Sequence, residues 1–418
     1  MWTDPGATGS RRRILDSLAH REPDRVPIDL GATPSSGISA VAYGRLLPHL
    51  GLAGLPNRVY DVVQELSEPD FPVLDRFGVD VLDIGRAFNA DPSAWAPLEL
   101  IPGTPALYPA WFRPGPVPGG GWEVVRPDGL RIARMPPGAT FFDQAVFPWV
   151  DGYPDKYAGL DEAMDQVLWS ALVHSPWDRA GEEGFWDRLR AHALDLRRTT
   201  DKALVIVCGC NLFEWGTFLR RLDNFLMDLV LEPDRVEGLL DALMERHLAF
   251  LDRVCRAVGD VADILRFGDD LGMDQGPLLS PEDYRRFFKP RHARLCDFVR
   301  RHSRMHTFLH SCGSIHALIP DLIEAGFEIL NPVQTSARHM EPERLKRDFG
   351  RDVTFWGGGC DTRRVLNRGT PGEVRDHVRR NLEILSPGGG FVFSAVHNIL
   401  SDVPPENIVA MMDTVLET

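Results

Sequence analysis

The clearest pattern in the sequence is a series of eight short apolar segments, each followed by a polar turn. They occupy residues 26–30, 79–84, 203–208, 262–267, 305–310, 328–331, 353–356 and 391–395. Gly, Pro or Asp bounds each segment, which is typical of strands buried in a parallel sheet. Helical periodicity fills most of the intervals between them. Strands alternating with helices predict an α/β protein, and eight such units predict one (β/α)8 TIM barrel spanning residues 1–418.

Two of the intervening helices have recognisable starting points. Ser280 and Pro281 form an N-cap and first-turn proline, and acidic residues follow them. Thr370 and Glu373 form a capping box ahead of apolar residues at helical spacing. These signals place a helix after the fourth segment and another after the seventh, as the barrel requires.

The interval between the second and third segments, residues 86–202, is far too long for a single crossover. It contains the Pro/Gly-rich stretches PGPVPGGGW and MPPGAT and several tryptophans. We expect an insertion over the barrel mouth after the second strand, with a small hairpin near residues 122–133. This region has two alternative interpretations. It is either a lid or binding segment, or an extension that only packs against the barrel.

Composition narrows the class of protein further. The chain has 418 residues, 44% of them hydrophobic, and a formal net charge of −14. This balance disfavours nucleic acid as a partner, and no apolar run is long enough to span a bilayer. The N-terminal residues 1–20 lack the apolar stretch of a signal peptide, so a cytoplasmic location is expected. The six cysteines are then expected to be free thiols or metal ligands rather than disulfides.

In a TIM barrel the active site lies at the carboxyl ends of the strands, and here those ends are polar. His310 and Cys312 are one residue apart at such an end, so in extended geometry both side chains point the same way. Cys360 follows the seventh strand on the same rim. Together these three residues predict a Zn²⁺ site with an open fourth position. Cys208 and Cys210 are a rival source of thiolates.

Further polar residues at these ends are candidates for catalysis and binding. Asp269 and Asp270 follow the fourth strand, and adjacent carboxylates there can act as acid and base or hold a cation. The alternative is that one caps a helix while the other pairs with an arginine. His397, just after the eighth strand, is the third catalytic candidate. The substrate-binding candidates are Asn211, Glu214, Asn331, Gln334 and Asp361.

Around these candidate residues, the sequence resembles that of the uroporphyrinogen decarboxylase-like superfamily. The stretches that carry the resemblance are RRRILDSLAHREPDRVPIDLG, GDDLGMDQGPLLSPEDYRRFFKPRHARL, FLHSCGSIHALIPDLIEAGFEILNPVQ, FWGGGCDTRRVLNRGTPGEVRDHVRRNLEIL and SPGGGFVFSAVHNILSDVPPENIVAMMD. The decarboxylases of the superfamily carry an Arg-rich motif after the first strand. This chain reads DLGATPSSG there, without arginine. The resemblance is therefore to the corrinoid-dependent methyltransferase branch, of the methylcobamide:coenzyme M methyltransferase kind.

That resemblance implies a methyltransferase assisted by zinc. It moves a methyl group between a small methylated substrate or a thiol and a corrinoid. The corrinoid is expected on a separate partner protein, because no DxHxxG-type corrinoid-binding motif is present. The family holds zinc with His-x-Cys, matched by His310 and Cys312, and with a later Cys in a PGCG-like turn. This chain has glycines in that turn, at residues 388–390, so Cys360 is the candidate in its place.

Two other functions stay open from the residues alone. One is a metal-free decarboxylase or lyase of the same fold, with Asp269, Asp270 and His397 in the catalytic roles. The other is a non-catalytic, tetrapyrrole-binding barrel. The sequence leaves the substrate, the direction of transfer and the oligomeric state open, a homodimer among the alternatives.

Overall fold

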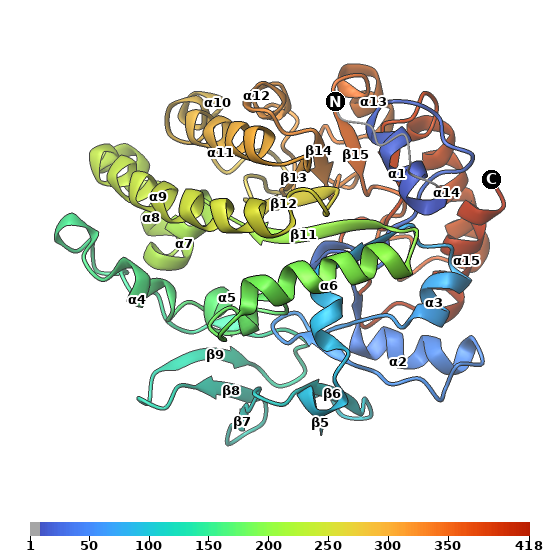
Figure 1. Cartoon of the computed structure of the whole chain (residues 1–418), viewed down its shortest axis with the longest axis horizontal. Coiled ribbons are helices and arrows are strands. Elements are labelled where there is room, and N and C mark those ends of the chain that lie inside the picture. Colours follow the sequence, from blue (N-terminus) through green and yellow to red (C-terminus); the bar gives the residue numbers. More distant parts are fainter. Residues whose placement is uncertain (1–8) are drawn as a thin grey trace.

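The computed structural model describes residues 9–418. The N-terminal stretch in which no signal peptide is expected therefore lies partly outside the described residues, at residues 1–8. The central feature of the fold is a sheet of parallel strands in the spatial order β16-β15-β14-β13-β12-β11-β4 (Figure 1). The strands are β4 (Val81–Asp83), β11 (Ala203–Gly209), β12 (Ile264–Gly268), β13 (His306–His310), β14 (Ile329–Asn331), β15 (Thr354–Trp356) and β16 (Phe391–Val392). Each coincides with one of the apolar segments predicted to be strands.

Residues 26–30, the first predicted strand, close the sheet into a barrel. Ile28 pairs in parallel with Phe393, just beyond β16. Phe393 N donates to the Pro27 carbonyl at 2.8 Å. On the other side, Asp80 N, just before β4, donates to the Ile28 carbonyl at 2.8 Å. The first and last units are thus joined, and the predicted TIM barrel of eight parallel strands is confirmed.

Side chains alternate between the inside and the outside of each barrel strand. Val81, Val205, Ile264, Phe308 and Ile329 belong to one buried cluster that fills the barrel interior. Helix α1 (Gly9–Leu18) contributes Ile14 and Leu18 to the same cluster and so covers the amino-terminal end. Two residues further along several strands, the inward positions become polar. The interior therefore changes from apolar to polar towards the carboxyl ends of the strands.

The outer helices cover the barrel with their apolar faces. They are α2 (Ala40–His49), α3 (Phe71–Arg76), α6 (Phe185–Thr199), α7 (Phe213–Arg220), α8 (Leu222–Leu231), α9 (Pro233–Val258), α10 (Pro281–Asp283), α11 (Lys289–His302), α12 (Ile319–Ala325), α13 (Pro342–Phe349), α14 (Pro371–Leu385) and α15 (Pro405–Leu416). The two predicted helix starts are confirmed. Ser280 accepts a hydrogen bond from Asp283 N, and Thr370 and Glu373 form the capping box.

The long segment between β4 and β11 forms small antiparallel sheets beside the barrel (Figure 1). Its elements are β5 (Trp95–Leu98), β6 (Ala106–Pro109), β7 (Gly115–Pro116), β8 (Trp122–Val125), β9 (Arg131–Met135), β10 (Asp143–Gln144), α4 (Leu160–Met164) and α5 (Leu168–Ala171). Strands β8 and β9 are the hairpin predicted near residues 122–133. A separate apolar cluster, which includes Tyr108, Phe112 and Ile132, packs this segment against Val59 and Val62.

A third small sheet lies between the first barrel strand and β4. It has the order β1 (Ile38–Ser39), β3 (Leu66–Ser67), β2 (Val59–Asp61). Ile38 also bridges to Ile399, beyond the last barrel strand, so this sheet lies at the carboxyl end of the barrel. None of the helices in residues 9–418 is long and apolar enough to cross a bilayer.

Candidate metal centre at the barrel mouth

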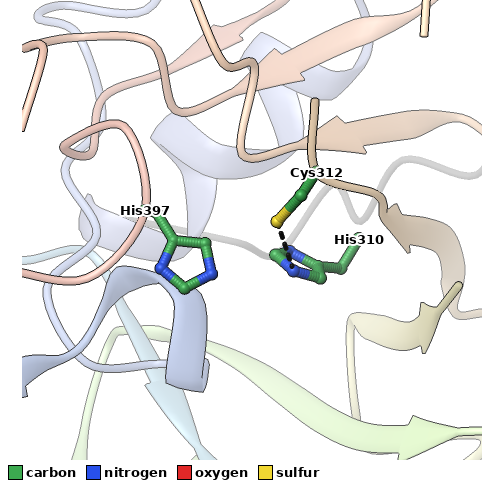
Figure 2. A group of neighbouring side chains, drawn as sticks. All are labelled: His310, Cys312 and His397. Carbon is green, nitrogen blue, oxygen red and sulfur yellow. Dashed lines mark hydrogen bonds between the residues drawn. The ribbon is translucent and has the colours of Figure 1, made fainter. Parts of the chain in front are cut away.

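Three side chains from two barrel units meet at the carboxyl end of the strands: His310, Cys312 and His397 (Figure 2). One nitrogen of each histidine and the Cys312 sulfur all lie within 4.8 Å of one another. The Cys312 Sγ is 3.4 Å from His310 Nε2, and the two imidazole rings are 5.5 Å apart between centroids. Two nitrogens and one sulfur at this spacing form a donor set suited to Zn²⁺.

The strand end positions His310. It is the last residue of β13, and its partner in the register is Gly268 at the end of β12. Phe308, two residues earlier, fills the barrel interior, so alternation turns His310 inward as well. Cys312 lies two residues further, as the His-x-Cys spacing predicts, and its backbone N–H donates to Asp270 Oδ1 at 2.8 Å.

Asn331 fixes which nitrogen of His310 is free. The Asn331 side chain donates from Nδ2 to the Trp356 carbonyl at 2.9 Å, so its Oδ1 faces His310. That oxygen is 2.6 Å from His310 Nδ1 and also accepts from Ser35 Oγ at 2.7 Å. An acceptor oxygen requires a proton on Nδ1, which leaves a lone pair on Nε2, the atom beside Cys312. A hydrogen bond of this kind orients histidines that bind metals.

The electrostatic surroundings favour a neutral His310 and a bound cation. Burial, reinforced by the nearby Arg266 charge, lowers the pKa of His310 to about 3, so its imidazole is neutral at physiological pH. Burial likewise lowers the pKa of His397. The pKa of the Cys312 thiol is raised by burial and then by the Asp270 carboxylate. A metal cation is the partner that would offset these effects and hold the sulfur as a thiolate.

His397 takes the place predicted for Cys360. The Cys360 side chain is fully buried in the main apolar core and does not join His310 and Cys312. Burial raises the pKa of its thiol far above the ordinary value. Gly357 and Gly358 precede it with positive φ angles of 113° and 75°, which break the strand alternation that would have turned Cys360 inward. The rival thiols Cys208 and Cys210 also lie outside the group.

The paired aspartates have different surroundings. Asp269 is completely buried and accepts hydrogen bonds from Phe213 N and Glu214 N, at 3.0 and 2.9 Å, at the start of α7. It also contacts His292 Nε2 at 3.2 Å. Asp269 is therefore a helix cap and does not fit the catalytic role predicted for it. Asp270, by contrast, lies 3.6 Å from His310 Nε2, and its side chain is 38% exposed.

The substrate-binding candidates also differ in their surroundings. Gln334 is engaged with the neighbouring loops, accepting from Gly313 N at 2.9 Å and donating to Asp274 at 2.8 Å. Asp361 accepts from the backbone N–H of Arg363 within its own turn. Asn211 donates to Glu214, and burial together with Asp270 raises the pKa of Glu214 well above its usual value. Asn211 and Glu214 thus border the site, whereas Asn331 orients a member of it.

Two further polar residues near the mouth were missed from the sequence. Arg266 is an inward-facing residue of β12, two positions before Gly268. Tyr60, on β2, is buried, and its ring packs edge-on against His174 at 5.4 Å. The signal for Arg266 was available, since a lone arginine in the apolar segment ADILRF is unusual in a buried strand. No local pattern marks Tyr60.

Comparison with known proteins agrees with this architecture. Residues 214–418 match the model of the family described as uroporphyrinogen decarboxylase (URO-D). The matched segment makes up just under half of the chain. It contains four of the five stretches on which the resemblance rests, and all three members of the metal centre. The superfamily predicted from the sequence is thereby confirmed.

Two proteins of known function are similar to this chain in sequence, and one solved structure is similar to it in fold. The methylcobamide:CoM methyltransferase MtaA of Methanosarcina barkeri is 25% identical over 189 residues, which are 45% of this chain and 51% of that protein. A uroporphyrinogen decarboxylase of Thermus thermophilus is 28% identical over 183 residues, 43% of this chain and 49% of that protein. The chain thus matches about half the length of each relative.

The solved structure is a methyltransferase from Methanosarcina mazei, with a TM-score of 0.59, 17% identity and coverage of 98% of both chains. It shows that the fold is shared over the whole length. The sequence match to MtaA supports the likeness to the methyltransferase branch of the uroporphyrinogen decarboxylase-like superfamily, whereas the structural match shows the fold alone.

Proposed function

We propose that this protein is a zinc-assisted methyltransferase, moving a methyl group between a small methylated compound or thiol and a corrinoid. The observation that carries the proposal is the His310–Cys312–His397 group at the barrel mouth. MtaA, a methylcobamide:CoM methyltransferase, supports the reaction class. The proposed metal ligands are His310, Cys312 and His397, with His397 in place of Cys360.

A zinc ion in this group would supply a Lewis acid that polarises the heteroatom bearing or receiving the methyl group. Three protein ligands leave the fourth position for that heteroatom. The protein's own contribution is to hold the donors in place. Asn331 keeps the proton on His310 Nδ1, and the Asp270 carboxylate fixes the backbone at Cys312.

Asp270 and Glu214 have complementary proton roles in this proposal. Asp270 lies beside the metal centre and faces solvent, so it can take a proton from a substrate thiol or from the Cys312 Sγ and pass it to water. Burial, reinforced by Asp270, raises the pKa of Glu214 well above its usual value, which favours the protonated form. It therefore donates a hydrogen bond to substrate rather than accepting one.

The second substrate, the corrinoid, is proposed to be carried by a separate protein that docks over the mouth. All six cysteines are free, which fits a thiolate centre working in the reducing cytoplasm. The competing lyase hypothesis is weakened by Asp269, because that residue caps α7 and is not placed to act on a substrate.

Turnover tests the proposal directly. The zinc-loaded protein is incubated with free methylcobalamin and a panel of small thiols, and loss of methylcobalamin is followed by absorbance. We expect thiol-dependent demethylation that disappears in His310→Ala and Cys312→Ala and persists in Cys360→Ala. Equal rates in the wild type and His310→Ala would rule out the proposed role of the centre. Decarboxylation of uroporphyrinogen by the wild type would favour the other branch.

A further inference from the structure

Two hydrogen-bond donors near the barrel mouth have no acceptor. The Tyr60 hydroxyl and Arg266 Nε are buried atoms without a hydrogen-bond partner anywhere in residues 9–418. Tyr60 is only 5% exposed. Buried polar groups are almost always paired, because an unpaired donor loses its bonds to water without replacement. Two such groups at one place indicate a polar ligand that belongs there.

Arg266 faces the barrel interior, and its charge reaches the Tyr60 hydroxyl. Val207 and Phe308 are the strand neighbours of Arg266 in the register, and both lie in the cluster that fills the barrel interior. Ile264, two residues earlier on the same strand, lies in it too. Alternation therefore directs the Arg266 guanidinium into the polar layer above this cluster. Tyr60 and Arg266 are close enough for each charge to influence the pKa of the other.

Arg266 is not simply the partner of the nearby carboxylates. Glu214 and Asp270 both act on its charge, but no ion pair joins Arg266 to either residue or to another acid in the described part of the chain. Its charge is partly balanced, while its buried Nε has no acceptor. A ligand with acceptor oxygens would satisfy both the guanidinium fork and the Tyr60 hydroxyl.

We propose that Arg266 and Tyr60 bind a carboxylate of the substrate, so that the enzyme acts on small methylated carboxylic acids. This rests on the proposed function, since it names the substrate class of that same site. Arg266 lies one layer below His310, which places the acid group deep in the barrel and the methyl-bearing heteroatom at the metal centre. A carboxylate fits better than a phosphate, because the nearby Asp270 carboxylate disfavours a dianion.

The test measures binding, with and without metal, by calorimetric titration. The probes are methoxyacetate, its uncharged analogue methoxyacetamide, and inorganic phosphate. We expect methoxyacetate to bind at least about tenfold more tightly than the amide or phosphate, the ratio expected for a charge-assisted hydrogen bond. Arg266→Gln should abolish this preference. The exposed Arg256→Gln is the matched control and should keep it.

Tyr60→Phe separates a binding role from a structural one. Removing a buried hydroxyl that has no partner should leave the melting temperature unchanged or raised, while methoxyacetate binds severalfold more weakly. This variant also serves if Arg266→Gln fails to fold. Equal binding of acid and amide, tighter binding of phosphate, or full affinity in Tyr60→Phe would overturn the proposal.

The metal-free arm distinguishes the two proposals. A carboxylate preference that persists in metal-depleted protein supports this site even if methyl transfer fails. Methyl transfer from acid and amide at equal rates would retain the proposed function and refute the carboxylate site.

Discussion

At the scale of single residues, Asn331 shows how a side chain outside the ligand set can control it. Its amide nitrogen donates to the Trp356 carbonyl, and its oxygen accepts a hydrogen bond from His310 Nδ1–H. The consequence is a fixed tautomer with the Nε2 lone pair beside Cys312. The amide thus sets the geometry of a ligand that it does not itself join.

Asn331→Ala should therefore weaken zinc binding by about 10- to 100-fold, the usual effect of losing such a partner. Competition with a chromogenic chelator measures the dissociation constant. Asn381→Ala is the matched control, because Asn381 is also buried and donates to a backbone carbonyl, that of Gly358 at 2.9 Å. It should lose stability but retain zinc affinity. Equal affinity in wild type and Asn331→Ala would contradict the assigned role.

The sequence predicted part of this centre. The spacing of His310 and Cys312 is a local property of one strand end, so it could be interpreted without a structure. The third member could not, because His397 reaches the pair only through closure of the barrel. Cys360 was predicted as the third ligand because it follows a strand on the same rim, and His397 was predicted to be catalytic. Strand alternation cannot be extended through three glycines, and the Cys360 side chain lies in the apolar core instead.

At the scale of elements, the segment before β4 and the insertion are joined by one buried pair. Tyr108 on β6 donates to Glu65, between β2 and β3, at 2.5 Å. Burial raises the pKa of Glu65 to about 8 from an ordinary 4.5. The folded protein therefore retains this proton at pH values where the unfolded chain has released it.

This shift predicts a pH-dependent stability. Between about pH 4.5 and 8 the folded state binds more protons at Glu65 than the unfolded state, so the free energy of unfolding falls as the pH rises. The loss amounts to a few kcal/mol at most. Glu65→Gln should remove this share of the slope and be relatively more stable at pH 8. Urea unfolding from pH 5 to 8 provides the comparison, and parallel curves for the two proteins would exclude the effect.

Elements were easier to predict than their contacts. Eight apolar segments and two capping signals located the strands and several helices, because burial between two layers leaves a strong local pattern. The hairpin at β8 and β9 was found in the same way. The insertion's role as a lid stays a prediction, since its packing on Val59 and Val62 depends on contacts that no local pattern encodes.

At the scale of the whole molecule, the amino-terminal end of the barrel is stabilised by buried charge. Asp80 is fully buried and binds Arg13 of α1 at 3.1 Å and Arg25 at 2.7 Å. Its Oδ2 also accepts from Ile28 N at 2.9 Å. One carboxylate thus connects α1, the first strand and β4 where the barrel closes, at the end opposite the metal centre.

Asp80→Ala should destabilise the protein by about 1–3 kcal/mol, because the buried Ile28 N–H loses its carboxylate acceptor and the half-buried Arg25 loses its ion pair. Chemical unfolding measures the change. The variant should bind zinc normally while folded, since the centre lies at the other end of the strands. Unchanged stability, or loss of zinc from a fully folded variant, would show that the two ends are not arranged as described.

The central claim, a metal centre made by His310, Cys312 and His397, is tested most directly by zinc content. Elemental analysis gives zinc per chain in protein purified without chelator, for the wild type and for the alanine variants of His310, Cys312, His397 and Cys360, with folding checked by circular dichroism. We predict one zinc per chain in the wild type and in Cys360→Ala, and little in the other three. A folded wild type without zinc, or zinc retained in His397→Ala but lost in Cys360→Ala, would contradict the account.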